Sequence, residues 1–178
     1  MTRVVLITHN ATYRGDLDLS SGVSGGLRFL DALNTPQRLR HGASRASPSL
    51  LIEKGVRYPR AGGTATPCCE QLVLRPAEVV AAYEEAESTA GGGEAAKSAV
   101  YEKRQERGGT KMLLHTANGL RLEGFVPGGS QNLEMAKTGR TFIPCTEVLV
   151  VDLEVEQPPL FIPFLAVNLL QVESYGTL

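Results

Sequence analysis

The fold is decided by one stretch of sequence, Leu72–Tyr83, which reads LVLRPAEVVAAY. The chain carries a second version of this stretch at Phe164–Tyr175, which reads FLAVNLLQVESY and aligns with the first without a gap. In both versions an apolar run meets a polar or proline break, and a second short run follows. Such a repeat defines the folding unit before any residue is assigned a role.

The beginnings of the two halves are also similar. Val4–Leu17 reads VVLITHNATYRGDL and Met112–Phe125 reads MLLHTANGLRLEGF, so each has an apolar run, a polar break and an alternating run that contains a glycine. We therefore predict two related units, residues 1–83 and residues 111–178. Residues 84–110 are rich in Glu, Ala, Lys, Arg and Gly, which predicts a charged linker that holds a solvated helix.

Each predicted unit contains about five strands, with a short helix or turn after the second strand. Alternation of apolar and polar residues with a period of two predicts the strands. Helical spacing predicts short helices near 27–33 and 132–137, and Asn118-Gly119 predicts a type I′ hairpin turn. A closed barrel leaves no exposed strand edge, so we expect a mainly β protein made of two homologous small five-stranded barrels.

Three features resemble the small barrels of the Sm/LSm and SH3-like kind, here in tandem. They are Gly15 and Gly124 in a bent second strand, a long third strand, and a closing pair of strands at Ala166–Val172 with the polar Asn168 at the bend. The chain is also similar to uncharacterised bacterial proteins with this barrel. It departs from the Sm pattern because the Asp or Asn pair that binds RNA bases and the glycine of the fourth-strand loop have no match, so RNA binding is not implied.

Bulk composition is that of a soluble globular protein, with 42% hydrophobic residues and a formal net charge of -1. This charge provides no general attraction to nucleic acid or acidic lipid. The three cysteines, Cys68, Cys69 and Cys145, are odd in number and two are adjacent, which argues against disulfides and favours a reducing compartment. The sequence begins with no secretory signal and has no apolar run of membrane-spanning length, so we expect a cytoplasmic protein.

The sequence contains no motif that points to catalysis. It has no Walker A loop, no GxGxxG after a strand, no HExxH and no CxxC. Adjacent Cys68 and Cys69 point to opposite faces of a strand and suit a tetrahedral zinc site poorly. His9 and His115 fall near the ends of equivalent first strands, where they form either a pseudo-symmetric pair or two unrelated polar positions. We expect no enzyme activity, no cofactor and no metal.

One basic concentration is a candidate anion-binding site for nucleic acid or a phosphorylated ligand. Its members lie in or beside the predicted third strand of the first unit: Arg38, Arg40, Arg45, Lys54, Arg57 and Arg60, with His41 between them. Tyr58 is the one aromatic residue nearby that could stack on a base. Such a cluster gives affinity only when its charges converge in space, and the alternative is a solvated loop with scattered charges.

The most apolar stretch of the chain is a candidate interface. It contains Phe161, Ile162 and Phe164 and is interrupted by Pro163. If Pro163 breaks the strand, the outward-facing residues form an interface with a partner or with the other half; otherwise they belong to a barrel core.

These features predict a binding or scaffolding protein that acts with a protein partner or by self-association. The first alternative is a nucleic-acid-binding or regulatory module that uses the basic stretch 38–60. The second alternative is a small-molecule sensor whose ligand lies between the two halves.

Overall fold

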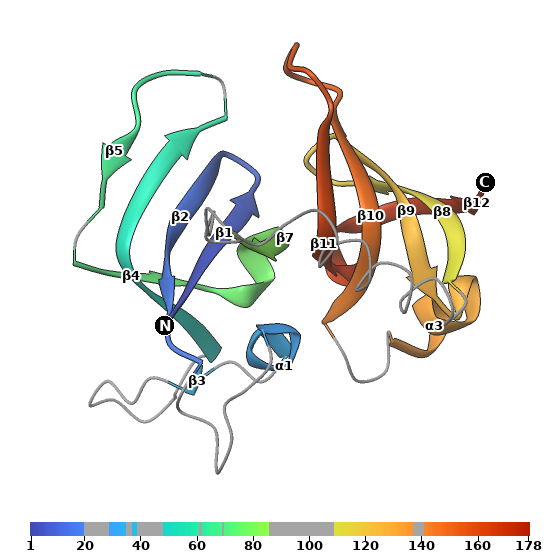
Figure 1. Ribbon diagram of the computed structural model, residues 1–178, viewed down its shortest axis with the longest axis horizontal. Helices are drawn as coiled ribbons and strands as arrows, with labels where there is room; N and C mark the ends of the chain where they lie inside the picture. Colours follow the sequence, from blue (N-terminus) through green and yellow to red (C-terminus); the bar gives the residue numbers. More distant parts are fainter. Residues whose placement is uncertain are drawn as a thin grey trace, which may run out of the picture.

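The first half of the chain forms a sequence of strands with one α-helix and one 3-10 turn (Figure 1). The computed structural model describes residues 1–19, 29–34, 37–38, 48–60, 62–68, 70–85, 109–136 and 141–178. The elements of the first half are β1 (Thr2–Thr8), β2 (Ala11–Leu17), α1 (Phe29–Asn34), β3 (Gln37–Arg38), β4 (Pro48–Pro59), β5 (Thr66–Pro67), β6 (Gln71–Leu74), η1 (Pro76–Glu78) and β7 (Val79–Glu84).

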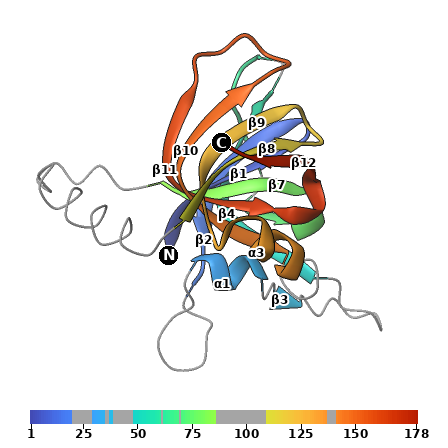
Figure 2. The ribbon, with the colours of Figure 1, turned by 90° about the vertical axis from the view of Figure 1, so that its right-hand side faces the viewer.

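The second half repeats this order of elements, except that its described part holds no counterpart of β3 or β5. Its members are β8 (Gly109–Thr116), β9 (Leu120–Pro127), α3 (Gly129–Ala136), β10 (Phe142–Asp152), β11 (Leu160–Asn168), η2 (Leu169–Gln171) and β12 (Val172–Thr177). In each half a helix follows the second strand, and a 3-10 turn separates the last two strands. The helices α1 and α3 lie at the same end of the molecule (Figure 2).

All the strands belong to antiparallel pairs that form one large sheet. Their order is β12-β8-β9-β10-β11-β7-β1-β2-β4-β3, and β5 and β6 also pair with β4. The path through the sheet does not close on itself. The prediction of a mainly β protein is therefore confirmed.

Strand pairing follows one register in the two halves. The 3-10 turns begin at Pro76 and Leu169, which are 93 positions apart. The pairs between β4 and β6 recur between β10 and β11 with the same shift of 93 positions. The gapless alignment of Leu72 with Phe164 is therefore wrong by one residue, and Leu72 corresponds to Leu165. The two leucine-rich runs look alike in either alignment, and only the hydrogen-bond register separates them.

Both halves contain a β-bulge at the same position of their longest strand. Lys54 in β4 and Glu147 in β10 have φ angles of 50° and 53°, in the left-handed region that non-glycine residues rarely adopt. Each residue lies where the pairing with the preceding strand changes register. A bulge inserts one extra residue and bends the strand. The repeat therefore includes the irregularity as well as the regular pairs.

A glycine lies opposite each bulge, as expected for a bent second strand. A Cβ atom on Gly15 would lie 2.4 Å from Cγ2 of Ile52 and 2.7 Å from the carbonyl oxygen of Glu53. The equivalent atom on Gly124 would lie 2.9 Å from Cγ2 of Val148. These distances are shorter than real Cβ contacts allow, so the bend requires glycine on the neighbouring strand.

The hairpin predicted at Asn118-Gly119 is confirmed, but its turn type is not. A type I′ turn needs a positive φ at both residues. Gly119 has a φ of 73°, while among the described non-glycine residues only Lys54 and Glu147 have a positive φ. The loop spans residues 117–119, and its last residue is left-handed. The side chain of Asn118 is buried and donates to the carbonyl oxygen of Thr8, so a tertiary contact selects this geometry.

The described core consists of two hydrophobic clusters, one mainly from each half. The first-half cluster also includes Phe142 of the second half. β7 contributes to both, with Val79 and Ala82 in the first-half cluster and Val80 and Ala81 in the second-half cluster. All four side chains are fully buried. β7 therefore lies between the two cores.

The two short helices predicted near 27–33 and 132–137 are confirmed as α1 and α3. α3 is longer than the single turn expected there. Residues 86–108 of the linker predicted at 84–110 lie outside the described residues, and so does the helix predicted within it.

Substitution of Gly15 by Ala should lower the free energy of unfolding by about 1–3 kcal/mol, because the added methyl group meets buried and backbone atoms. Urea denaturation would measure the change. Gly176→Ala is the matched control: no atom lies within 4 Å of its would-be Cβ, so we expect a change below about 0.5 kcal/mol. An equal loss in both variants would contradict the steric argument.

Candidate functional site: a cleft between the two halves

A cleft of about 220 Å³ lies between the two halves. The first half lines it with residues of β1 and β2 and with Tyr58–Arg60 at the end of β4. The second half lines it with Val150 and Asp152 of β10, Gln157 and Pro158 of the following loop, and Leu160 of β11. The sheet joins the halves at the other end of β11, where this strand pairs with β7. The cleft therefore lies at the start of β11, where this strand does not pair with β7.

An ion pair crosses the cleft. Nε of Arg60 donates to Oδ2 of Asp152 at 2.8 Å, and Nη2 of Arg60 donates to Oδ1 at 2.6 Å. Nη1 of Arg60 lies 3.1 Å from a carboxylate oxygen of Glu154. A two-pronged contact of guanidinium with carboxylate combines charge with fixed geometry. The arrangement therefore fixes the separation of the two halves at this end.

Local backbone structure positions both partners. Arg60 follows the last residue of β4, and its N–H donates to the carbonyl oxygen of Asn10 at 3.1 Å. Asp152 ends β10, and its Oδ1 accepts hydrogen bonds from the N–H groups of Glu154 and Val155. The side chains of Arg60 and Asp152 are 13% and 16% exposed. Partial burial reduces the screening of their charges by solvent and salt.

The ionisation of both partners reflects this contact. Burial alone raises the pKa of the Asp152 carboxyl, but the hydrogen bonds and charge of Arg60 and the backbone N–H groups outweigh it, so the pKa lies below its ordinary value of 3.8. The hydrogen bond with Asp152 raises the pKa of Arg60, against the effect of burial. Both groups are therefore held in their charged forms at neutral pH.

The side chain of Asn168 also ties the halves together, directly after the residues of β11 that pair with β7. Asn168 is fully buried, and its Nδ2 donates to the carbonyl oxygens of Pro76 and Val79. Its Oδ1 accepts from the N–H of Leu170, so Asn168 caps η2 at the bend where sequence placed it. These three hydrogen bonds satisfy a buried amide and hold β11 against η1 and β7.

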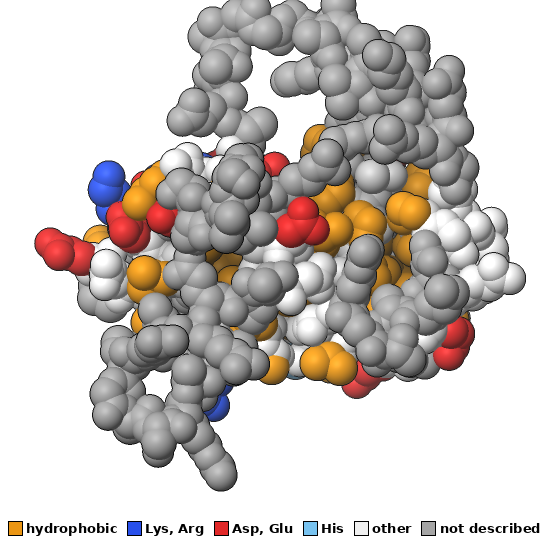
Figure 3. All heavy atoms as spheres, turned by 90° about the horizontal axis from the view of Figure 1, so that it is seen from below, with side chains coloured by type: hydrophobic (Ala, Val, Ile, Leu, Met, Phe, Trp, Pro, Cys, Tyr) orange, Lys and Arg blue, Asp and Glu red, His pale blue; other side chains and the backbone are white. Residues whose placement is uncertain are grey.

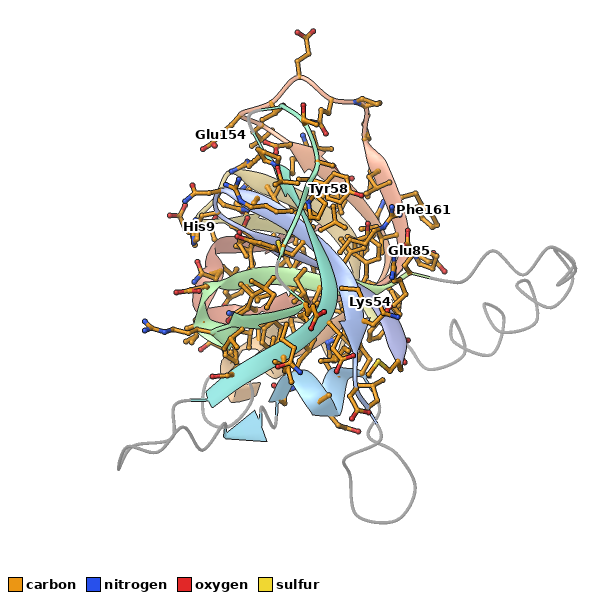
Figure 4. All side chains as sticks on the ribbon, turned by 90° about the vertical axis from the view of Figure 1, so that its left-hand side faces the viewer. His9, Lys54, Tyr58, Glu85, Glu154 and Phe161 are labelled. Carbon is orange, nitrogen blue, oxygen red and sulfur yellow. The ribbon has the colours of Figure 1, made fainter. Side chains whose placement is uncertain are left out.

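The basic stretch is only partly brought together. Arg40, Arg45 and His41 lie outside the described residues, as does the side chain of Arg38, whose backbone lies in β3. Lys54 is exposed at the bulge, and Arg57 is half-buried further along β4. Lys54 lies along β4 away from Tyr58 and Glu154 (Figure 4). Arg60 is already paired with two carboxylates, so it is not a free cation for a nucleic-acid phosphate.

Viewed from below, the few Lys and Arg side chains that can be seen lie toward the first half, and hydrophobic side chains are visible over both halves (Figure 3).

The three candidate interface residues have different environments. Phe161 is 55% exposed, whereas Ile162 is 3% exposed and belongs to the second-half core. Phe164 is half-buried and packs against the first-half core. Pro163 does not break β11: the pairing passes from Ile162 to Phe164, and Pro163 lies at the bulge formed by Glu147 in β10. A strand tolerates proline at such a position because no ladder hydrogen bond needs its N–H.

The candidate metal and histidine positions do not converge. Nε2 of His9 lies 2.8 Å from Oε1 of Gln171, whereas Nδ1 of His115 lies 3.2 Å from Oγ of Ser174. Burial raises the pKa of the Cys145 thiol to about 12, which disfavours the thiolate that metals and electrophiles require. Cys69 lies outside the described residues. Within the described residues, no group of three or more His, Cys, Asp or Glu side chains could hold a metal ion.

Sequence reasoning identified Arg60 but missed its partners Asp152 and Glu154. Asp152 and Glu154 lie at the end of the long apolar strand of the second half, as Arg60 does in the first half. This similar position in sequence could have suggested an ion pair, but sequence alone does not show which strand ends lie opposite each other.

Asp152→Asn should lower the free energy of unfolding at neutral pH by about 1–2 kcal/mol, because it removes the charge that Arg60 faces. A lowered carboxyl pKa adds stability above its unfolded-state value near 3.8, and this stability is lost as the pH falls through the folded-state pKa. The difference between wild type and variant should therefore shrink as the pH falls below about 4. Urea denaturation over a pH series would measure it. The exposed control Glu156→Gln should show no such gap, and a gap for Asp152→Asn that stays constant with pH would refute the assignment.

In the part of the chain that the structure describes, no helix is both long and apolar enough to cross a membrane. The chain matches no protein-family model, no curated protein and no solved structure.

Proposed function

We propose that the chain is a non-catalytic binding or scaffolding protein, built from two copies of one small five-stranded barrel, that acts in a protein complex. The proposed units are residues 1–83 and 111–178, with 84–110 as the linker. Each unit has its own run of four hydrogen-bonded neighbours, β7-β1-β2-β4 with β6 and β12-β8-β9-β10 with β11. The 3-10 turns η1 and η2 connect the fourth and fifth strands of each proposed unit.

One observation carries the binding role: apolar side chains are exposed at and beside the cleft. Tyr58 and Leu160 line the cleft and are 37% and 50% exposed, and Phe161 follows Leu160 in β11. Exposed aromatic and aliphatic groups beside a fixed charged pair are common at protein interfaces, where they act as anchors.

The size of the cleft favours a polypeptide partner over a metabolite. Cavities that bind small molecules usually measure about 300–1,000 Å³. The cleft, at about 220 Å³, is smaller than this range and could admit one or two side chains of a partner. The small-molecule alternative therefore has less support than the protein-binding one.

Replacement of both Tyr58 and Leu160 by Ser should reduce recovery of the partner about tenfold, because the apolar anchors are lost. The measurement is quantitative mass spectrometry of proteins captured by the tagged chain from its own cells. The matched control is Leu170→Ser, which changes a leucine that is 72% exposed and lies outside the cleft. An unchanged partner set in the double variant would exclude the cleft as the binding surface.

The nucleic-acid alternative makes a different prediction, which the same protein can test. Retention on nucleic acid would weaken steeply with salt and would be lost when Arg38, Arg40 and Arg57 are all replaced by Gln. Retention that ignores salt and survives these changes would remove this alternative.

A further inference from the structure

The cleft between the halves combines apolar walls with one charged side. Its apolar lining comes from both halves and includes Ile7, Tyr58, Leu120, Val150 and Leu160. Among the described residues, the charged ones that line it are Arg60 and Asp152. The first half contributes the cation and the second half the anion, so the combination exists only where the two halves meet.

Negative charge exceeds positive charge at this side of the cleft. The single guanidinium of Arg60 contacts two carboxylates, those of Asp152 and Glu154, so the three groups together carry one excess negative charge. Glu156, in the same loop, is acidic and exposed. The side chain of Glu154 is 63% exposed, so its carboxylate is accessible to a second cation.

We propose that the cleft accepts one basic side chain, a Lys or an Arg, from a segment of the partner protein. The aliphatic part of that side chain lies along the apolar walls, and its cation lies beside the carboxylates of Asp152 and Glu154. This inference rests on the function proposed above, and it names the chemistry of the partner at the same site.

A basic side chain matches both parts of the cleft. Lys and Arg have long aliphatic stems that cover apolar surface while the charged head stays close to water. A volume of about 220 Å³ admits a stem of this kind. Tyr58 lines the cleft, and an aromatic ring attracts a cation that lies over its face. Tyr58 and Glu154 lie toward the same end of the molecule (Figure 4).

Other kinds of side chain match the cleft less well. An Asp or Glu of the partner would enter beside two carboxylates, and Arg60 already donates to Asp152 through Nε and Nη2 and contacts Glu154 through Nη1. A purely apolar side chain would remove water from these charges and supply nothing in return. A basic side chain removes the same water but supplies the missing positive charge.

Selection of random peptides by the immobilised full-length chain tests this inference. We expect the enriched peptides to share a Lys or Arg beside apolar residues. Replacement of that basic residue by Met keeps a long flexible side chain but removes the charge, and it should raise the Kd of an enriched peptide about tenfold. The Kd should also rise with ionic strength, because salt screens the exposed carboxylate.

Glu154 provides the matching change on the protein. Glu154→Gln should raise the Kd about threefold, and Glu154→Lys about tenfold, because like charges would then meet. The melting temperature of Glu154→Gln should stay close to that of wild type, since the side chain is mostly exposed. The matched control is Glu173→Lys, an exposed glutamate of β12 that does not line the cleft, and it should leave the Kd within about twofold of wild type.

The inference and the proposed function can fail separately. Tyr58→Ser with Leu160→Ser should weaken the binding of every enriched peptide. Peptides that need Tyr58 and Leu160 but keep their affinity when their basic residue or Glu154 is changed would overturn the inference alone, and so would enrichment of Asp or Glu. Peptides that ignore Tyr58 and Leu160, or a selection that enriches no peptide, would overturn both the inference and the proposed use of the cleft.

Discussion

β7 is hydrogen-bonded along both edges and covered on both faces, and the rest of the structure depends on this. It pairs with β1 on one side and with β11 on the other. Its side chains are divided between two cores, Val79 and Ala82 in the first-half cluster and Val80 and Ala81 in the second-half cluster, and all four are buried. A polar or bulky residue here would disturb both halves at once, because neither core has another strand that could take its place.

The cleft follows from how short the β7–β11 pairing is. Ala166 and Val167 of β11 pair with β7, and the residues before them in β11 pair with β10. The resulting separation is spanned at its far end by Arg60 and Asp152. Backbone pairing and a charged contact thus fix the two halves at two distant points, which resists both sliding and opening. Tyr58, Leu160 and Phe161, at and beside the cleft, remain exposed.

Sequence could predict the elements but not the contacts between them. Alternation of residues predicted the strands, and Gly15, Gly124 and Asn168 marked the bends, because each requirement is local. The contact between Arg60 and Asp152 joins residues 92 positions apart, so it depends on how two strand ends meet in space. The turn at Asn118 was wrong for the same reason: a buried contact with Thr8, far away in sequence, determines its conformation.

The joint between the halves has a consequence for how the sequences of the two halves differ. Position 80 and position 173 are the same site of the repeat, yet one holds a buried Val and the other an exposed Glu. A residue at position 80 must fit a packed core, whereas position 173 accepts a polar or charged side chain. The two halves are therefore expected to differ most in sequence where β7 and β12 correspond.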